Sequence, residues 1–285
     1  MWLVFSVNAT YLVVEVIGGI LTHSLALLSD AGHMLSDVGA IGIALAASRI
    51  SHRRPSVRRT YGYGRAEVLA GLANGLTLWL IVGAIFLEAV RRLISPPPVL
   101  SGAMLAIGAA GLALNVLSAA VLFRHRKYNL NLRAAFLHVM ADSLGSVGVV
   151  AAGVIMLKWG YFMADPLASL FIGLLILASS WGLIKESIHI LLEGTPHHLS
   201  IEIVRSQLEQ IEGVKACHDL HIWLIGSGEP ILTAHLDANP EADRTAILRE
   251  ATFFLSETYG VHHVTIQVEK ETLPESHHGI GPTDE

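Results

Sequence analysis

Two histidines each stand four residues ahead of an aspartate within apolar stretches of this chain. The pairs are His33 with Asp37, in SDAGHMLSDVGA, and His138 with Asp142, in AAFLHVMADSLGS. Residues four apart on an α-helix lie on the same face, one turn above the other. Two imidazoles and two carboxylates match the number and type of ligands in a tetrahedral zinc site. The repeated spacing therefore predicts one metal site built from both pairs.

Each pair alone has a plainer explanation, because a histidine and an aspartate inside a membrane also form interhelical hydrogen bonds that hold a bundle together. Independent hydrogen-bonding pairs have no reason to repeat the same chemistry at the same spacing, so two matching pairs favour the metal site. Asp30, one turn before His33, and Asn8 and Glu15 in NATYLVVEVIGG are further polar residues in apolar sequence. Each has three open interpretations: support for the ligands, part of an ion path, or helix packing, which suits Asn8 best.

The composition is that of a membrane protein. Of 285 residues, 52% are hydrophobic and 15% are charged, and the mean hydropathy is +0.54, which is too apolar for an ordinary soluble domain. The net charge of −5 gives no indication of nucleic-acid binding. A single cysteine, Cys217, excludes an internal disulfide. Since an ionisable side chain near the bilayer centre costs at least about 2.5 to 3.5 kcal/mol, the two pairs need a compensating partner such as a cation.

Six apolar stretches approach the roughly 20 residues that a helix needs to cross a bilayer core. They are residues 2–22, 26–50, 66–90, 102–123, 134–157 and 165–186, and they define a six-span domain of residues 1–190. Basic residues concentrate in the connections between spans two and three and between spans four and five, so the positive-inside rule places both termini in the cytoplasm. Asp165 is expected to cap span six.

A small soluble domain is predicted over residues 191–272. Hydrophobic periodicity predicts two helices, one containing Ile201 and Leu208 and one containing Ile247 and Leu255. Alternation predicts strands in ACHDLHIWLI, PILTAHLDA and HHVTIQVEK. The order αββαβ suits a small open sheet with helices on one face. Residues 273–285 are expected to be a disordered tail. The predicted fold class is an α-helical membrane protein with six transmembrane helices and a C-terminal α+β domain.

At these motifs the chain resembles the cation diffusion facilitators, in the branch of zinc transporters whose transport site has two histidines and two aspartates. The resemblance covers nearly the whole chain and rests on SLALLSDAGHMLSD, YGYGRAEVLA, AAFLHVMADSLGSVGV, ADPLASL, HDLHIWLI, AHLD and TIQVE. It implies a homodimeric transporter of six spans with a cytoplasmic ferredoxin-like domain, which exchanges a divalent metal for protons. The transport-site positions of the family fall on His33, Asp37, His138 and Asp142.

The resemblance also implies a metal site in the cytoplasmic domain. Positions that bind zinc in related proteins fall on His218, His235, His262 and Glu269, with His221 and His263 as adjacent competitors. Histidines on strand faces are also common as plain surface residues, so that interpretation stays open. Some relatives have a further site between spans two and three; this chain has Tyr63 where they place a histidine, so that site is expected to be missing. Arg65 matches a basic position that pairs with an acid after span six, here Glu193.

The expected function is export of zinc from the cytoplasm by alternating access, coupled to protons, and the chain is not expected to be an enzyme. Three other functions stay in view: an intramembrane metalloenzyme, a passive channel and a metal sensor. A catalytic zinc usually keeps a position open for water, and the H-E-x-x-H motif is absent. Channels favour weak binding at several sites along a pore, whereas here the ligands are concentrated.

Zn²⁺ is expected both as the transported ion and as a regulatory ion, and Cd²⁺ or Co²⁺ would accept similar ligands. The expected partners are the lipid bilayer, a second copy of the chain and protons, without nucleic acid. The loop between spans four and five is only RHRKYNLNLR, without the long histidine-rich segment of many eukaryotic relatives. This favours a bacterial inner membrane as the location.

Overall fold

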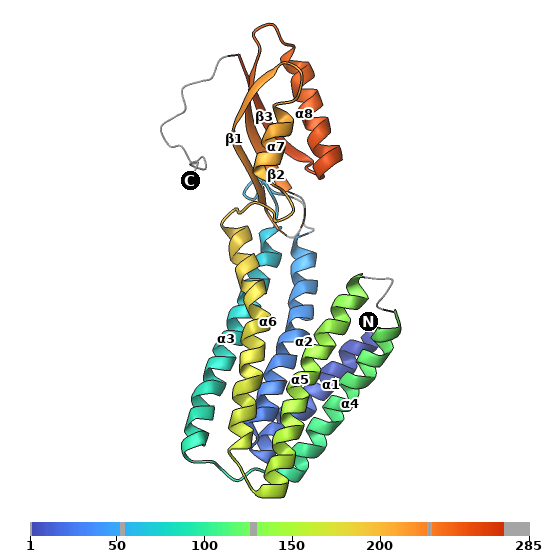
Figure 1. The fold of residues 1–285 in the computed structure, drawn as a ribbon, viewed down its shortest axis with the longest axis vertical. Helices are drawn as coiled ribbons and strands as arrows, with labels where there is room; N and C mark the ends of the chain where they lie inside the picture. The colour runs from blue at the N-terminus through green and yellow to red at the C-terminus, as the bar shows by residue number, and fades with distance from the viewer. Residues whose placement is uncertain (1, 52–54, 126–129, 227, 229, 271–285) are drawn as a thin grey trace. The chain divides into compact units, whose positions relative to one another are not determined.

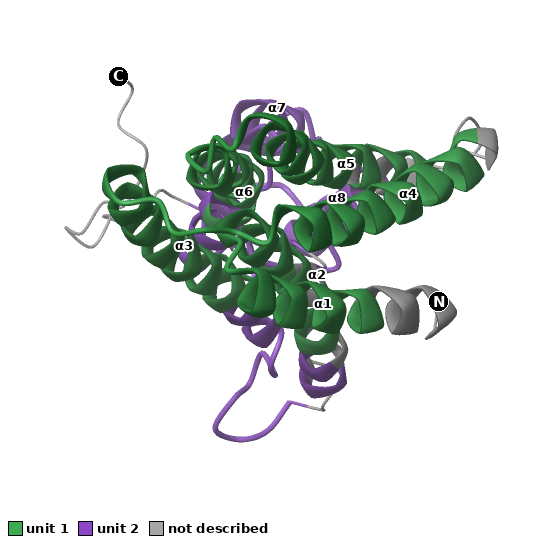
Figure 2. Ribbon diagram, turned by 90° about the horizontal axis from the view of Figure 1, so that it is seen from below, with its two compact units in different colours: residues 1–44, 71–184 green, residues 45–70, 185–285 purple. Residues whose placement is uncertain are grey.

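The computed structural model describes residues 2–51, 55–125, 130–226, 228 and 230–270. Contacts divide the chain into two compact units, coloured separately in Figure 2. The helical unit comprises residues 1–44 and 71–184, and the sheet unit comprises residues 45–70 and 185–285. The expected disordered tail, residues 273–285, lies outside the described residues.

Six long helices lie at the six apolar stretches of the sequence (Figure 1). They are α1 (Trp2–Thr22), α2 (Leu25–Ser51), α3 (Arg65–Ile94), α4 (Ser101–His125), α5 (Leu130–Trp159) and α6 (Ala164–Leu191). By length and composition, α3 to α6 each contain an apolar stretch that is able to cross a membrane, and the apolar stretch of α1, Ala9–Thr22, is shorter. The described residues therefore form a helical membrane domain with four clear spans.

The core of the helical unit is apolar and closely packed. Its almost fully buried side chains include Leu27, Val82, Met104, Val149 and Ile176. Glycine allows α4 to approach α5, because a Cβ atom on Gly108 would lie 2.6 Å from Val149 Cγ1. Small residues at such positions let membrane helices pack backbone against backbone. Helix α5, which carries one of the two His/Asp pairs, is thereby held against α4.

A buried carboxylate fixes the beginning of α2. Asp165, in the first turn of α6, accepts hydrogen bonds from Ser24 Oγ at 2.6 Å, the Leu25 N–H at 2.7 Å and the Ala26 N–H at 3.1 Å. Arg92 of α3 lies 3.8 Å from the same carboxylate and supplies the opposite charge. The first N–H groups of a helix lack partners within the helix, so this aspartate satisfies the N-terminus of α2. The expectation that Asp165 caps its own helix differs from this arrangement, because α6 already begins at Ala164 and the side chain turns to its neighbour.

The sheet unit contains a three-stranded sheet and two further helices in the expected order αββαβ. Its elements are α7 (Ile201–Leu208), β1 (Val214–Leu224), β2 (Pro230–Ala238), α8 (Arg244–Tyr259) and β3 (His263–Glu269). The strand order is β1-β2-β3, with β1 antiparallel and β3 parallel to β2. Leu208, Leu236 and Leu255 are fully buried in the core between helices and sheet. Leu208 and Leu255, which belong to the apolar faces of the two predicted helices, thus both lie in this core.

Both helices of the αββαβ segment have clear end signals. Ser200 accepts a hydrogen bond from the Ile203 N–H, and Asp243 accepts from the N–H groups of Thr245 and Ala246. Such side-chain caps satisfy the first free N–H groups of a helix. α8 ends at Gly260, whose φ of 65° is left-handed and favours glycine.

The sheet unit also contains the predicted pair of Arg65 and Glu193. Arg65 Nη2 donates to Glu193 Oε1 at 2.6 Å, which joins the beginning of α3 to the segment after α6. Both side chains are exposed, at 41% and 59%, so this pair contributes at most about 1 kcal/mol to stability. The pair holds the beginning of α3 close to the segment that follows α6. Nearby, Gly64 packs against Ile225, and the Tyr61 ring meets the His263 ring edge-on at 5.5 Å.

We expect Asp165→Ala to lower the free energy of unfolding by about 3 kcal/mol, because it removes three buried hydrogen bonds and leaves their donors at the beginning of α2 unsatisfied. Glu212→Ala, a change at an exposed acid, should alter stability by less than about 0.5 kcal/mol. Chemical denaturation of the purified protein in detergent measures both. Equal denaturation midpoints for the two variants would contradict the role assigned to Asp165.

Candidate metal sites

One residue from each His/Asp pair meets between α2 and α5. His33 Nε2 lies 3.2 Å from Asp142 Oδ1, and the two side chains are only 17% and 21% exposed. Helix α2 also carries Asp37 and helix α5 also carries His138, each four residues from its pair mate; their side chains lie outside the described residues. Four-residue spacing keeps each pair on one helix face. That Asp37 and His138 supply the remaining ligands stays a prediction.

The contact between His33 and Asp142 has two chemical uses. A protonated imidazole makes an interhelical ion pair with the carboxylate, which is the plainer interpretation of the pair. A neutral imidazole and an ionised carboxylate instead offer lone pairs to a divalent cation, and the cation replaces the protons. At a separation of 3.2 Å, a proton and a divalent cation would compete for the same atoms of the two side chains.

Polar side chains hold α2 in place around this contact. Ser146 Oγ of α5 donates to Asp30 Oδ2 at 3.3 Å and accepts from Asn115 Nδ2 of α4 at 3.2 Å. Asn74 Nδ2 of α3 donates to Ser36 Oγ of α2 at 3.0 Å. Hydrogen bonds among neighbouring elements orient metal ligands and set their basicity. α2 is thus tied directly to α3 and α5 within two turns of His33, and through Ser146 to α4.

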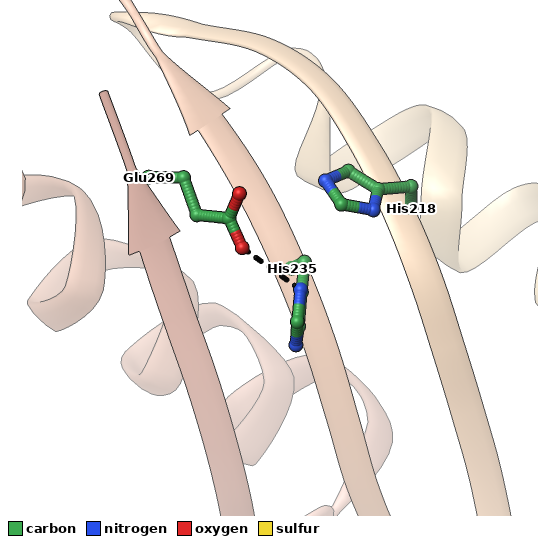
Figure 3. A group of neighbouring side chains, drawn as sticks. All are labelled: His218, His235 and Glu269. Carbon is green, nitrogen blue, oxygen red and sulfur yellow. Dashed lines mark ion pairs between the residues drawn. The ribbon is translucent and has the colours of Figure 1, made fainter. Parts of the chain in front are cut away.

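A second cluster lies on the sheet, with one residue from each strand: His218 on β1, His235 on β2 and Glu269 on β3 (Figure 3). Strand register explains the grouping. His218 pairs directly with His235, and Glu269 pairs with Asp237, which is two residues after His235 and on the same face of β2. Each of the three side chains offers one ligand atom, and these atoms lie within 4.8 Å of one another.

The cluster is suited to a zinc ion. His235 Nδ1 lies 2.9 Å from Glu269 Oε1, and the Glu269 side chain is only 3% exposed. Both ring nitrogens of His218 are buried without a hydrogen bond within the described part of the chain. Burying a ring nitrogen without a hydrogen bond is costly, and a metal would satisfy one nitrogen of His218. Two imidazoles and a carboxylate leave one tetrahedral position for a further ligand.

Asp237 lies beside the cluster and is not among the ligands predicted from the sequence. Its Oδ1 atom lies 3.5 Å from His218 Nε2. The signal in the sequence was its spacing, because AHLDA puts an aspartate two residues after a candidate histidine on a predicted strand.

Cys217, next to His218, does not belong to the cluster. Strand alternation turns it to the opposite face, where it is 5% exposed within the sheet unit's core. Burial raises the pKa of this thiol to about 11, and the Glu209 carboxylate adds to the effect. At neutral pH the thiol keeps its proton and is therefore a poor metal ligand.

The other histidines named from the sequence lie elsewhere. His262 precedes β3, and its Nδ1 atom is 2.9 Å from Ser256 Oγ. Seven residues of extended strand, roughly 23 Å, separate it from Glu269, so it is not one of the three grouped residues. His221 contacts Asp219 at 2.9 Å beyond a register shift in β1, and His263 meets Tyr61 at the start of β3. Tyr63 lies under the Arg59 guanidinium at 4.5 Å.

Comparison with known families gives two adjacent matches. Residues 1–192 match the family described as "Cation efflux transmembrane domain", and residues 196–271 match "Cation efflux protein, cytoplasmic domain". Together the two matches cover nearly the whole chain.

Several curated proteins are similar along most of their length. The zinc transporter ZitB of Pectobacterium atrosepticum is 43% identical over 275 residues, which are 96% of this chain and 86% of the relative. The cadmium, cobalt and zinc/H⁺-K⁺ antiporter of Bacillus velezensis is 42% identical over 264 residues, 91% of this chain and 84% of the relative. Among solved structures, the metal-bound C-terminal domain of the CzcD transporter from Cupriavidus metallidurans is 35% identical, with a TM-score of 0.24; the match covers 25% of this chain and 99% of that one.

If the two His/Asp pairs form one site, either Asp37→Ala or Asp142→Ala should weaken zinc binding there by at least about 100-fold, because each removes a ligand. Calorimetry on purified protein in detergent measures this in a background that also carries His218→Ala and His235→Ala, so that the sheet cluster does not contribute. Ser143→Ala is the matched control on α5, since its hydroxyl donates to Val139 O of its own helix. An unchanged isotherm in both aspartate variants would exclude the shared site.

For the sheet cluster, we expect His218→Ala to reduce zinc affinity by at least about tenfold, while the adjacent Cys217→Ala leaves it unchanged. The comparison uses competition with a zinc-chelating dye on protein that carries Asp142→Ala, which removes a predicted ligand from the helical unit. Equal losses in the two variants would mean that β1 disruption, and not ligand removal, is the cause.

Proposed function

The chain belongs to the cation diffusion facilitator (cation efflux) family, and from this premise we propose that it exports zinc from the cytoplasm in exchange for protons. The observation that carries the proposal is the contact of His33 with Asp142, which joins the two His/Asp pairs across α2 and α5 at 3.2 Å. The relatives named for transport of zinc, cadmium and cobalt support the same class of cargo.

The proposed architecture has six membrane-crossing helices, with α1 and α2 completing the four clear spans, and a ferredoxin-like cytoplasmic domain in the sheet unit. The αββαβ order and the β1-β2-β3 sheet support the second part. The concentration of arginine and lysine between α2 and α3 and between α4 and α5 supports cytoplasmic termini. Curated bacterial relatives support a bacterial inner membrane as the location.

In the proposed mechanism, zinc arrives from the cytoplasm and binds His33, Asp37, His138 and Asp142. Binding requires neutral imidazoles and ionised carboxylates, so protons leave as the metal enters. Rearrangement of the helices then opens the site to the other side, where protons displace the metal. Histidine suits this exchange, because its ordinary pKa of about 6.5 lets small changes in surroundings move it between protonated and metal-binding forms.

The sheet cluster has a regulatory role in this proposal. Zinc held by His218, His235 and Glu269 would tie β1, β2 and β3 together at rising cytoplasmic zinc. Two observations support this role. The family match over residues 196–271 assigns this segment to the cytoplasmic domain, and the ends of α2, α3 and α6 belong to the same unit as the sheet. We further propose that the chain is a homodimer, as the sequence resemblance implies. Cd²⁺ and Co²⁺ would be accepted by the same nitrogen and oxygen ligands.

An intramembrane metalloenzyme is a weaker candidate, because four proposed ligands fill a tetrahedral zinc and leave no position for a reacting water. A channel is weaker because channels favour weak binding at several sites along a pore, whereas the proposed ligands belong to one site. A sensor would need the sheet cluster but not the His33 and Asp142 contact inside the helical unit.

The test is zinc uptake by protein reconstituted in liposomes, with and without an acidic lumen. Each proton exchanged allows up to about tenfold more zinc accumulation per pH unit of gradient, so the unmodified protein should respond strongly. His33→Asp keeps a ligand atom but removes a group that titrates near neutrality, so we expect zinc uptake with a weaker response to the gradient. Zinc uptake that ignores the gradient in the unmodified protein would exclude antiport.

A further inference from the structure

Helix α1 places a carboxylic acid in the interior of the helical unit. Glu15 is fully buried, and neither of its carboxylate oxygens has a hydrogen-bond partner within the described part of the chain. Its electrostatic neighbours are the carboxyl group of Asp30 on α2 and the hydroxyl group of Tyr11 on its own helix. Asp30 is itself only 4% exposed. Two acids from different helices therefore share one buried location.

The described groups around Glu15 do not supply a positive charge. The Tyr11 hydroxyl donates to Ile107 O of α4 at 2.9 Å, and Asp30 accepts from Ser146 of α5 at 3.3 Å. The charged groups that act on Asp30 besides Glu15 are His33 and Asp142, at the proposed metal site. Among the described residues that influence Glu15 there is no lysine or arginine.

Such an arrangement is not stable with both acids ionised. A buried ionised carboxylate without a partner costs several kcal/mol, and two adjacent carboxylates repel each other, so one of them takes up a proton. Arg92 shows the contrast within the same unit, because it supplies the charge that Asp165 needs. Glu15 has no such partner among the described residues, and Asp30, one turn before His33, connects it electrostatically to the metal ligands.

We propose that Glu15 is a proton-binding site of the transporter, separate from the four metal ligands, which holds a proton beside Asp30 when the metal site is empty and releases it when zinc binds. The inference rests on the proposed zinc/proton exchange. A positive charge of zinc at His33 and Asp142 would stabilise the carboxylate anions nearby and so favour the ionised form of these acids. The proton leaves the Glu15 carboxyl group, no covalent bond other than O–H breaks, and the metal takes over the charge balance. Glu15 thus adds a proton to those displaced from the ligands.

The test counts protons released per zinc bound, by titrating zinc into the purified full-length protein in weakly buffered detergent solution with a pH indicator. Glu15→Gln keeps the shape of the protonated side chain, so zinc affinity should stay within about threefold, while about one proton fewer is released per zinc at the transport site. Glu88→Gln is the matched control: the same acid-to-amide change in the helical unit, at a carboxylate that Arg92 already pairs at 2.9 Å. It should release as many protons as the unmodified protein.

Glu15→Asp restores an acid and should restore the lost proton, which a merely structural role for Glu15 would not predict. It also keeps the inference testable should Glu15→Gln be unstable, since its proton count must then match that of the unmodified protein.

An unchanged count in folded Glu15→Gln overturns the inference, as does loss of zinc binding in that variant, which would make Glu15 a metal ligand. Repeating the titrations with K⁺ replaced by N-methylglucamine identifies the ion, because a count that changes with K⁺ would assign the site to a monovalent metal ion instead. If the unmodified protein releases no protons at all, the proposed exchange itself fails; if it does and Glu15→Gln releases as many, only this inference fails.

Discussion

The hydrogen bonds from the N-terminus of α2 to the Asp165 carboxylate are the interaction on which the helical unit depends. They fix where α2 begins, and a helix is stiff enough that fixing its first turn also fixes the depth of residues two turns later. His33 and Asp30 are such residues. Arg92 of α3 shares the same carboxylate, so α2, α3 and α6 meet at one buried group. Inside a membrane domain, hydrogen bonds of this kind help to set how the helices pack.

The two candidate metal sites use different geometries for the same ligand types. In the helical unit, ligands four residues apart lie on two helices, so their separation changes whenever α2 and α5 move against each other. In the sheet unit, the ligands lie on three strands whose register is set by backbone hydrogen bonds, so their separation is nearly constant. The first arrangement suits an ion that must enter and leave. The second suits an ion that is sensed and retained.

The sequence was sufficient to predict much of this molecule, because apolar length and strand alternation are local properties. Helix positions and the αββαβ order were accessible in that way, whereas the pairing of Arg65 with Glu193 was expected from the family resemblance. The partner chosen by Asp165 was not, because it depends on which helix end packs beside α6. Which side chains meet on the sheet depends on the register of the strands. The pairing of β1 with β2 brings Asp237 near His218, whereas His262, which was expected from the resemblance, lies at the opposite end of β3 from Glu269. The side chains of Asp37 and His138 lie outside the described residues, so their placement remains a sequence prediction.

The three-strand origin of the sheet cluster has a consequence for the lifetime of the protein. Only the folded sheet brings His218, His235 and Glu269 within 4.8 Å, so a bound ion would favour the folded over the unfolded domain. At a free zinc concentration 100 times the dissociation constant, that preference amounts to about 2.7 kcal/mol. Proteases act on transiently opened chains, and a difference of this size changes the opened population about 100-fold. The amount of transporter in the membrane would then rise with the metal it removes, through slower degradation and without any change in synthesis.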